Sequence, residues 1–131
     1  MKIFVYGTLL KGLSRNRKLS RSQFIGAGVV RGVLYDLGAF PALLETEDNS
    51  IAGELYEVDE RTLWMLDDVE SYDSENSSDS LYIRKDIDVL LTKNNEIIKA
   101  QTYIYNRPLK TSAIKIVSGN YFEYQNKLTT E

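Results

Sequence analysis

The pattern of apolar and polar positions predicts five β-strands. Alternation is clearest over Ile51–Val58, where Ile51 and Leu55 share one face and Tyr56 lies on the other. The remaining predicted strands are rich in β-branched, aromatic or leucine side chains: Lys2–Tyr6, Gly26–Asp36, Leu81–Thr92 and Ile97–Tyr105. Glycines inside Gly26–Asp36 predict bulges or strong coiling.

One segment has the spacing of an amphipathic helix. Leu63, Leu66 and Val69 recur at three-residue intervals, which places them on one helix face. Asp59 precedes them as an N-cap, and Glu60 places a negative charge in the first turn, where the helix dipole favours it. A helix is therefore predicted over Glu60–Val69.

The segments between these elements are predicted to be turns and loops. Two of them have clear signals, since Lys93–Glu96 contains an Asn-Asn pair suited to a hairpin turn and Leu37–Leu44 turns around Gly38 and Pro41. Ser71–Ser80 is polar, acidic and of low complexity, which predicts a mobile loop. Ser14–Ser22 is predicted to hold one or two helical turns, and Thr111–Lys127 to be irregular or a short helix.

The order of the elements predicts the fold class. Strands follow one another along the chain, and only one helix is strongly patterned. Consecutive strands tend to pair with each other, so the sheet should be mostly antiparallel. We therefore predict a single α+β domain over residues 1–131, with a mixed, mostly antiparallel β-barrel and one or two flanking helices.

The amino-acid composition limits which catalytic and metal-binding groups the chain can use. The 131 residues include no Cys and no His, which excludes thiol nucleophiles, disulfides, zinc-thiolate sites, His-based metal sites and Ser-His-Asp catalysis. An enzyme made from this chain must use carboxylates, hydroxyls, Lys, Arg or main-chain dipoles. A net charge of −3 gives no basis for nucleic-acid binding. The locally basic stretch Arg15–Arg21 is interpreted as a solvated surface, with a phosphate-binding site as the alternative.

The sequence shows neither a membrane span nor a cleavable signal peptide. No run approaches the roughly 20 apolar residues that cross a bilayer, and the opening MKIFVYGTLL is followed by no small-residue cleavage site. The expected location is the cytoplasm, with no membrane partner. Nothing in the sequence indicates an oligomeric state.

The first candidate for chemistry is the turn Tyr6-Gly7-Thr8-Leu9, with Gly12 following. A glycine-containing turn after a strand can present successive main-chain N–H groups to a carboxylate or an oxyanion. The alternative is an ordinary turn. A phosphate-binding loop is excluded because the Gly-Lys-Ser/Thr ending is missing.

The second candidate is the acidic end of the predicted helix, where Asp67, Asp68 and Glu70 lie close together. Mutual repulsion and the negative end of the helix dipole both disfavour ionisation, so a carboxyl there is expected to have a raised pKa. The alternative is an acidic helix end that faces water. No spacing matches an EF-hand calcium loop.

Two strands carry polar side chains at alternate positions. Tyr82 and Arg84 share a strand face, and Arg84 is suited either to a substrate carboxylate or to an ion pair with the acidic cluster. Tyr103 and Tyr105 form a similar set, for which aromatic core packing is the preferred interpretation. Arg84 and Tyr105 are retained as candidates for anchoring the substrate or supporting the site.

Taken together, these segments resemble the γ-glutamylcyclotransferase-like family, and within it the γ-glutamylamine cyclotransferases and AIG2-like proteins. The resemblance runs from Lys2 to Tyr105 and is carried by four blocks in order: Phe4–Leu9 with Gly12, Gly53–Glu60, Leu66–Ser71 followed by Tyr82 and Arg84, and Tyr103–Tyr105. The four blocks occurring in this order are more specific for the family than the YGTL turn alone. The segment Tyr72–Leu81 is longer than the family's usual spacing.

The resemblance implies a compact mixed β-barrel that forms 5-oxoproline from a γ-glutamyl compound. It maps the family's substrate-binding loop onto Tyr6, Gly7, Thr8 and Leu9, and its catalytic glutamate onto Glu70, with Glu75 in the longer loop as a rival. The substrate's own α-amine attacks its γ-carbonyl, so neither an enzymic nucleophile nor a metal or organic cofactor is expected. Two other functions remain open: a non-catalytic small-molecule binder or regulator on the same barrel, and a protein-interaction module using Ser71–Ser80.

Overall fold

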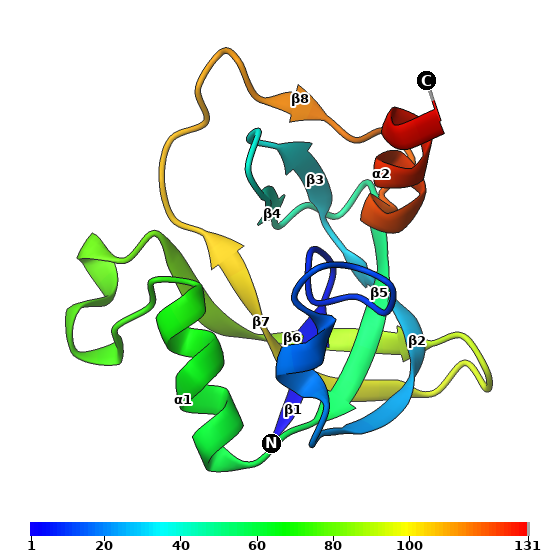
Figure 1. Cartoon of the computed structure of the whole chain (residues 1–131), viewed down its shortest axis with the longest axis vertical. Coiled ribbons are helices and arrows are strands. Elements are labelled where there is room, and N and C mark those ends of the chain that lie inside the picture. Colours follow the sequence, from blue (N-terminus) through cyan, green and yellow to red (C-terminus); the bar gives the residue numbers. More distant parts are fainter. Residues whose placement is uncertain (131) are drawn as a thin grey trace.

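A closed β-barrel forms the body of the protein in the computed structural model, which describes residues 1–130 (Figure 1). The strand order around the barrel is β1-β5-β2-β6-β7. Their bounds are β1 Lys2–Val5, β2 Gln23–Arg31, β5 Ser50–Glu57, β6 Tyr82–Leu91 and β7 Ile97–Tyr105. Neighbours pair antiparallel except where β1 meets β7, parallel, at Ile3 and Gln101. The predicted fold class, a mixed and mostly antiparallel barrel with flanking helices, is confirmed.

A small second sheet lies beyond one end of the barrel, in the order β4-β3-β8 (Figure 1). Its strands are β3 Val33–Asp36, β4 Pro41–Leu44 and β8 Ile114–Lys115. The prediction of one strand over Gly26–Asp36 was wrong, because the chain leaves the barrel at Gly32, whose N–H donates to the Asn49 carbonyl. The prediction of a turn throughout Leu37–Leu44 was also wrong, since its second half pairs with β3.

Helix α1, Glu60–Val69, packs beside the barrel and has the predicted bounds. Asp59 caps it, with its Oδ1 accepting a 2.7 Å hydrogen bond from the Thr62 N–H. Leu63 and Leu66 are its buried residues. A second helix, α2 (Tyr121–Thr130), follows β8 and lies against the small sheet, where the Tyr124 hydroxyl donates to Asp36.

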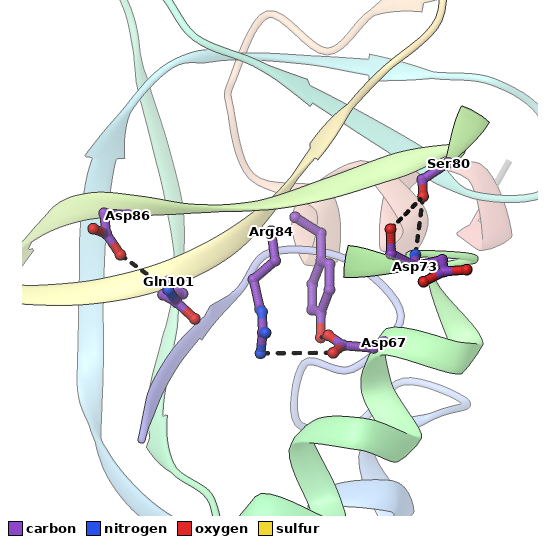
Figure 2. Close-up of polar contacts among 7 residues, drawn as sticks. Asp67, Asp73, Ser80, Arg84, Asp86 and Gln101 are labelled. Carbon is purple, nitrogen blue, oxygen red and sulfur yellow. Dashed lines mark hydrogen bonds and ion pairs between the residues drawn. The ribbon is translucent and has the colours of Figure 1, made fainter. Parts of the chain in front are cut away.

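Two short 3-10 helices complete the described chain. The first, η1 (Asn16–Leu19), lies in the segment predicted to hold one or two helical turns. The second, η2 (Ser74–Asp79), gives regular structure to the segment predicted as a mobile loop, although Asn76 departs from helical geometry. The Ser80 hydroxyl joins the ends of this segment, accepting from the Asp73 N–H at 2.9 Å and donating to the Asp73 carbonyl (Figure 2).

The core fills the barrel and continues under α1. Phe4, Leu55 and Val89 are fully buried within it. Gly53 is required where β5 crosses β1, because a Cβ at this position would overlap the Val5 carbonyl and the Phe4 ring. No helix within residues 1–130 is long and apolar enough to span a membrane.

Candidate active site

A cavity of about 120 Å³ opens where β1 ends and α1 ends. The turn after β1, the C-terminal end of α1 and the first residues of β4 and β6 form most of its wall. Its lining residues are Phe4, Val5, Tyr6, Gly7, Thr8, Leu9, Arg15, Phe40, Pro41, Val69, Glu70, Ser71, Leu81, Tyr82 and Tyr103. The structure therefore brings together, from distant parts of the chain, the predicted binding turn and the predicted catalytic glutamate.

The turn after β1 leaves main-chain donors free beside this cavity. The Gly7 carbonyl accepts from the Leu10 N–H at 3.0 Å, and the Thr8 carbonyl accepts from the Arg15 N–H at 2.9 Å. In a trans peptide the N–H points opposite to the carbonyl of the same plane, so the N–H groups of Thr8 and Leu9 point away from these bonds. Neither N–H donates to an acceptor in the described chain. The turn thus has the free donors of an anion-binding nest.

Gly7 leaves room for Pro41 in the wall of the cavity. A Cβ on residue 7 would lie 2.7 Å from Pro41 Cγ, closer than real Cβ contacts. The Tyr6 hydroxyl donates a buried 2.6 Å hydrogen bond to the Tyr103 carbonyl. This bond fixes the start of the turn to β7.

Glu70 is the C-cap of α1 and is partly buried in the cavity wall. Burial raises the pKa of its carboxyl from the usual 4.5 to about 7, and the positive charge of Arg15 opposes part of that rise. A raised pKa was predicted for the acidic helix end, but its cause is desolvation rather than repulsion from Asp67 and Asp68. At neutral pH this group populates both protonation states, as an acid/base catalyst requires.

Three tyrosine hydroxyls surround Glu70 and are already engaged as donors. Tyr6 bonds the Tyr103 carbonyl, Tyr82 bonds the Pro41 carbonyl at 2.6 Å, and Tyr103 bonds Asp67 Oδ1 at 2.6 Å. Burial raises the pKa of each hydroxyl far above neutrality. These groups therefore stay protonated, which leaves Glu70 as the lining group that exchanges protons near pH 7.

Arg84 and Tyr105 lie behind the cavity wall and are not among its lining residues. Arg84 extends from β6 to Asp67, with Nη1 3.6 Å from Oδ2, as Figure 2 shows. The Tyr105 ring packs edge-on against Tyr82, with centroids 5.4 Å apart. Tyr105 thus packs on the lining residue Tyr82, and Arg84 contacts Asp67, which accepts a hydrogen bond from the lining residue Tyr103.

The cavity also contains residues that the sequence did not single out. Arg15 was interpreted as part of a solvated surface, and this was wrong, because its side chain is half-buried and lines the cavity. Phe40 and Pro41 come from the segment interpreted as a turn. Glu75, the rival to Glu70, is exposed and does not line the cavity. Arg15 follows the turn closely in sequence, which was the available signal for its position.

The described residues contain no group of three or more Asp or Glu side chains placed to hold a metal ion. The donors that the described lining residues offer to a ligand include the Thr8 and Leu9 N–H groups, the Arg15 guanidinium and protonated Glu70. These suit a small anionic organic molecule.

The fold and the cavity together define a class of protein: a small mixed β-barrel in which one partly buried carboxyl lines the same cavity as free main-chain donors. Residues 3–123 match the family model described as "Gamma-glutamyl cyclotransferase, AIG2-like". The chain belongs to this family of γ-glutamylcyclotransferase enzymes.

Individual relatives agree with the family match. A Methanocaldococcus jannaschii protein named for the γ-glutamylcyclotransferases is 34% identical over 127 residues, which cover 94% of this chain and 97% of the relative. The γ-L-glutamyl-butirosin B γ-glutamyl cyclotransferase of Niallia circulans is 33% identical over 107 residues, covering 80% of this chain and 67% of that protein. The crystal structure of an AIG2-like protein from Mus musculus superimposes with a TM-score of 0.68 at 26% identity, covering 82% of this chain and 78% of that one.

Proposed function

We propose that this protein converts a γ-glutamyl amine or γ-glutamyl amino acid to 5-oxoproline and releases the free amine, with Glu70 as general acid and base. The observation that carries the proposal is the shared cavity of Glu70 and the turn Gly7–Leu9. A single carboxyl and a set of anion donors are sufficient for this reaction because the substrate supplies its own nucleophile. We also propose that the chain acts as one catalytic domain and works in the cytoplasm.

The reaction begins with a proton transfer. The substrate's α-ammonium gives one proton to the Glu70 carboxylate, and the freed lone pair attacks the γ-carbonyl carbon. A five-membered ring closes, and the carbonyl oxygen becomes an oxyanion. Protonated Glu70 then gives its proton to the amide nitrogen as the old C–N bond breaks. The regenerated carboxylate takes the extra proton from the ring nitrogen and passes it to the departing amine, which leaves as the ammonium form.

The pKa of Glu70 determines the free-energy cost of moving the first proton from the substrate's α-ammonium to the Glu70 carboxylate. A reference α-amine has a pKa of about 8, one unit above the value of about 7 for Glu70. The transfer therefore costs roughly 1.4 kcal/mol, since each pKa unit corresponds to about that free energy. A glutamate with an ordinary pKa of 4.5 would make the same transfer about 5 kcal/mol uphill. Burial of Glu70 thus removes most of this barrier.

Ring closure benefits from the shape of the site. Intramolecular attack by a well-oriented group has an effective molarity of about 10⁵–10⁸ M. The apolar wall made by Phe4, Val5 and Phe40 would keep the glutamyl chain folded and exclude water. The Thr8 and Leu9 N–H groups would hold either the α-carboxylate or the developing oxyanion.

The name of one relative and the family resemblance both bear on the leaving amine. The name of the Niallia circulans relative specifies a γ-glutamyl derivative of butirosin B, and the resemblance within the family favours γ-glutamylamines over glutathione. We therefore propose γ-glutamyl amines as the first substrates to test.

The experiment measures 5-oxoproline release from a panel of γ-glutamyl amines and dipeptides, comparing wild-type protein with Glu70→Gln. Loss of the acid/base group should lower the rate by about 10²-fold or more. Glu75→Gln is the matched control, because Glu75 is exposed and outside the cavity, and it should retain wild-type activity. Near-wild-type turnover by a folded Glu70→Gln protein would reject the assignment of Glu70. Binding of the panel without any turnover by the wild type would favour a non-catalytic binder instead.

A further inference from the structure

Arg15 lines the cavity, and its positive charge acts on the neighbouring carboxyl of Glu70. Among the described lining residues, Arg15 carries the only permanent positive charge, and its side chain forms no hydrogen bond or ion pair in the described chain. Half-buried arginines are usually paired, because an unpaired charge away from water is unfavourable. A ligand that enters this cavity would therefore meet a cation that forms no direct ion pair in the described chain.

The main chain around Arg15 is fixed to the binding turn. The Arg15 N–H donates to the Thr8 carbonyl at 2.9 Å, and the Asn16 side chain donates to the Leu9 carbonyl at 2.8 Å. Asn16 Nδ2 also contacts the Tyr56 hydroxyl at 3.3 Å, which ties this segment to β5. The same bonds that free the turn's N–H groups thus hold the base of the Arg15 side chain beside them.

We propose that Arg15 binds the α-carboxylate of the γ-glutamyl group and leaves the Thr8 and Leu9 N–H groups to stabilise the oxyanion at the γ-carbonyl. This proposal rests on the proposed function and assigns separate roles to its two anion-binding elements. Guanidinium and carboxylate form strong charge-assisted hydrogen bonds, whereas preorganised main-chain donors suit a charge that develops only in the transition state.

Charge balance favours the α-carboxylate over a carboxylate on the leaving group. After Glu70 has accepted the substrate's proton it is neutral, and the Tyr6, Tyr82 and Tyr103 hydroxyls are neutral as well. The cavity then carries one positive charge, on Arg15, and the substrate carries one negative charge, on the α-carboxylate that every γ-glutamyl compound has. A second carboxylate on the leaving group would have no second cation to balance it among the described lining residues.

The test measures binding rather than turnover, using the wild-type protein, Arg15→Met and Arg15→Lys. Calorimetry would compare 5-oxoproline, which has the carboxylate, with 5-oxoprolinamide, which lacks it. Arg15→Met should bind 5-oxoproline about tenfold or more weakly, the usual effect of losing a hydrogen bond to a charged group, and should bind the amide as the wild type does. Arg15→Lys should retain part of the preference. Arg17→Met is the matched control, since Arg17 is exposed two residues away, and it should match the wild type.

Equal affinity of the wild type and Arg15→Met for 5-oxoproline would overturn the assignment, as would an equal loss for the amide. So would the absence of measurable 5-oxoproline binding to the wild type at millimolar concentration. A second arm compares γ-glutamylalanine with γ-glutamylethylamine in the Glu70→Gln background. If Arg15→Met weakened only the alanine compound, Arg15 would bind the leaving group's carboxylate and the proposal would fail. Arg15-dependent product binding in a protein without turnover would instead reject the proposed function alone.

Discussion

The Tyr103 hydroxyl donates a 2.6 Å hydrogen bond to Asp67 Oδ1, and this bond joins β7 to the last turn of α1. The other carboxylate oxygen of Asp67 lies 3.6 Å from Arg84 Nη1, on β6 (Figure 2). Glu70 follows at the end of the same helix. Asp67 thus connects two barrel strands to the helix end that places the proposed catalytic carboxyl.

Replacing Asp67 should therefore destabilise the protein. Asp67→Ala would leave the Tyr103 hydroxyl without its acceptor and Arg84, whose side chain is 16% exposed, without its counter-ion. We expect a loss of about 2–4 kcal/mol in the free energy of unfolding, because removing one partner of a mostly buried pair leaves the other uncompensated. Urea unfolding measures this. Asp68→Ala is the control, since Asp68 is exposed, and should change stability by under about 0.5 kcal/mol. Similar losses for the two variants would contradict the role given to Asp67.

The pH dependence of kcat/KM should report the ionisation of Glu70. Glu70 must be a carboxylate to accept the first proton, so kcat/KM should fall as pH drops below its pKa of about 7. The alkaline limb should follow the substrate's ammonium group, near pH 8. Because the Arg15 charge lowers the pKa of Glu70, Arg15→Met should move the acid limb to higher pH, and Arg15→Lys should move it less. An acid limb near pH 4.5 would show that Glu70 is not desolvated in the free enzyme.

The same buried carboxyl should make the fold less stable at high pH. The folded-state pKa of Glu70, about 7, lies above the unfolded value of 4.5, so the folded state binds its proton more tightly. The resulting destabilisation is absent below pH 4.5, grows between pH 4.5 and 7, and is complete above pH 7. Glu70→Gln should thus match the wild type near pH 4 and exceed its stability by on the order of 3 kcal/mol at pH 8. Denaturation at both pH values measures this. A Glu75→Gln control should show no such trend, and a constant difference for Glu70→Gln would contradict the burial of Glu70.

Local signals were sufficient to predict the helix that carries Glu70. Asp59 caps it and Leu63 and Leu66 define its buried face, and all of these signals lie within a few residues of one another. The hairpin of β6 and β7 was predicted for the same reason, because its turn and alternation are local. The split between β2 and β3 was not predictable in this way. Strand-favouring residues lie on both sides of Arg31 and Gly32, and pairing with β4 and with the distant β8 separates the two strands.

Some residues of the candidate site could be predicted from the sequence, and others are brought into place only by the fold. The turn Gly7–Leu9 and Glu70 were predicted by the family resemblance, whereas Arg15 and Arg17 look alike in sequence. Arg15 and Arg17 both follow the turn closely, so this signal does not separate them, and the tertiary structure places Arg15 in the cavity wall and leaves Arg17 exposed. The shift in the pKa of Glu70 likewise depends on burial, which the folded structure produces. A raised pKa was predicted from the neighbouring charges of Asp67 and Asp68. The direction was right, but the cause is desolvation of the carboxyl.

Gly7 offers a test of the cavity that changes no charge. In Gly7→Ala the new methyl group would lie 2.7 Å from Pro41 Cγ, so either the turn or Pro41 must move. Overpacking of this kind typically costs about 1–3 kcal/mol of stability, and the movement would shift the Thr8 and Leu9 N–H groups away from their positions in the cavity. We expect the protein to fold but to bind 5-oxoproline at least about tenfold more weakly, because donor geometry determines the strength of such contacts. Gly26→Ala is the matched control, since a Cβ there would make ordinary contacts, the nearest at 3.7 Å from Leu91, and it should bind as the wild type does. Unchanged binding by a folded Gly7→Ala protein would show that the turn does not contact the ligand.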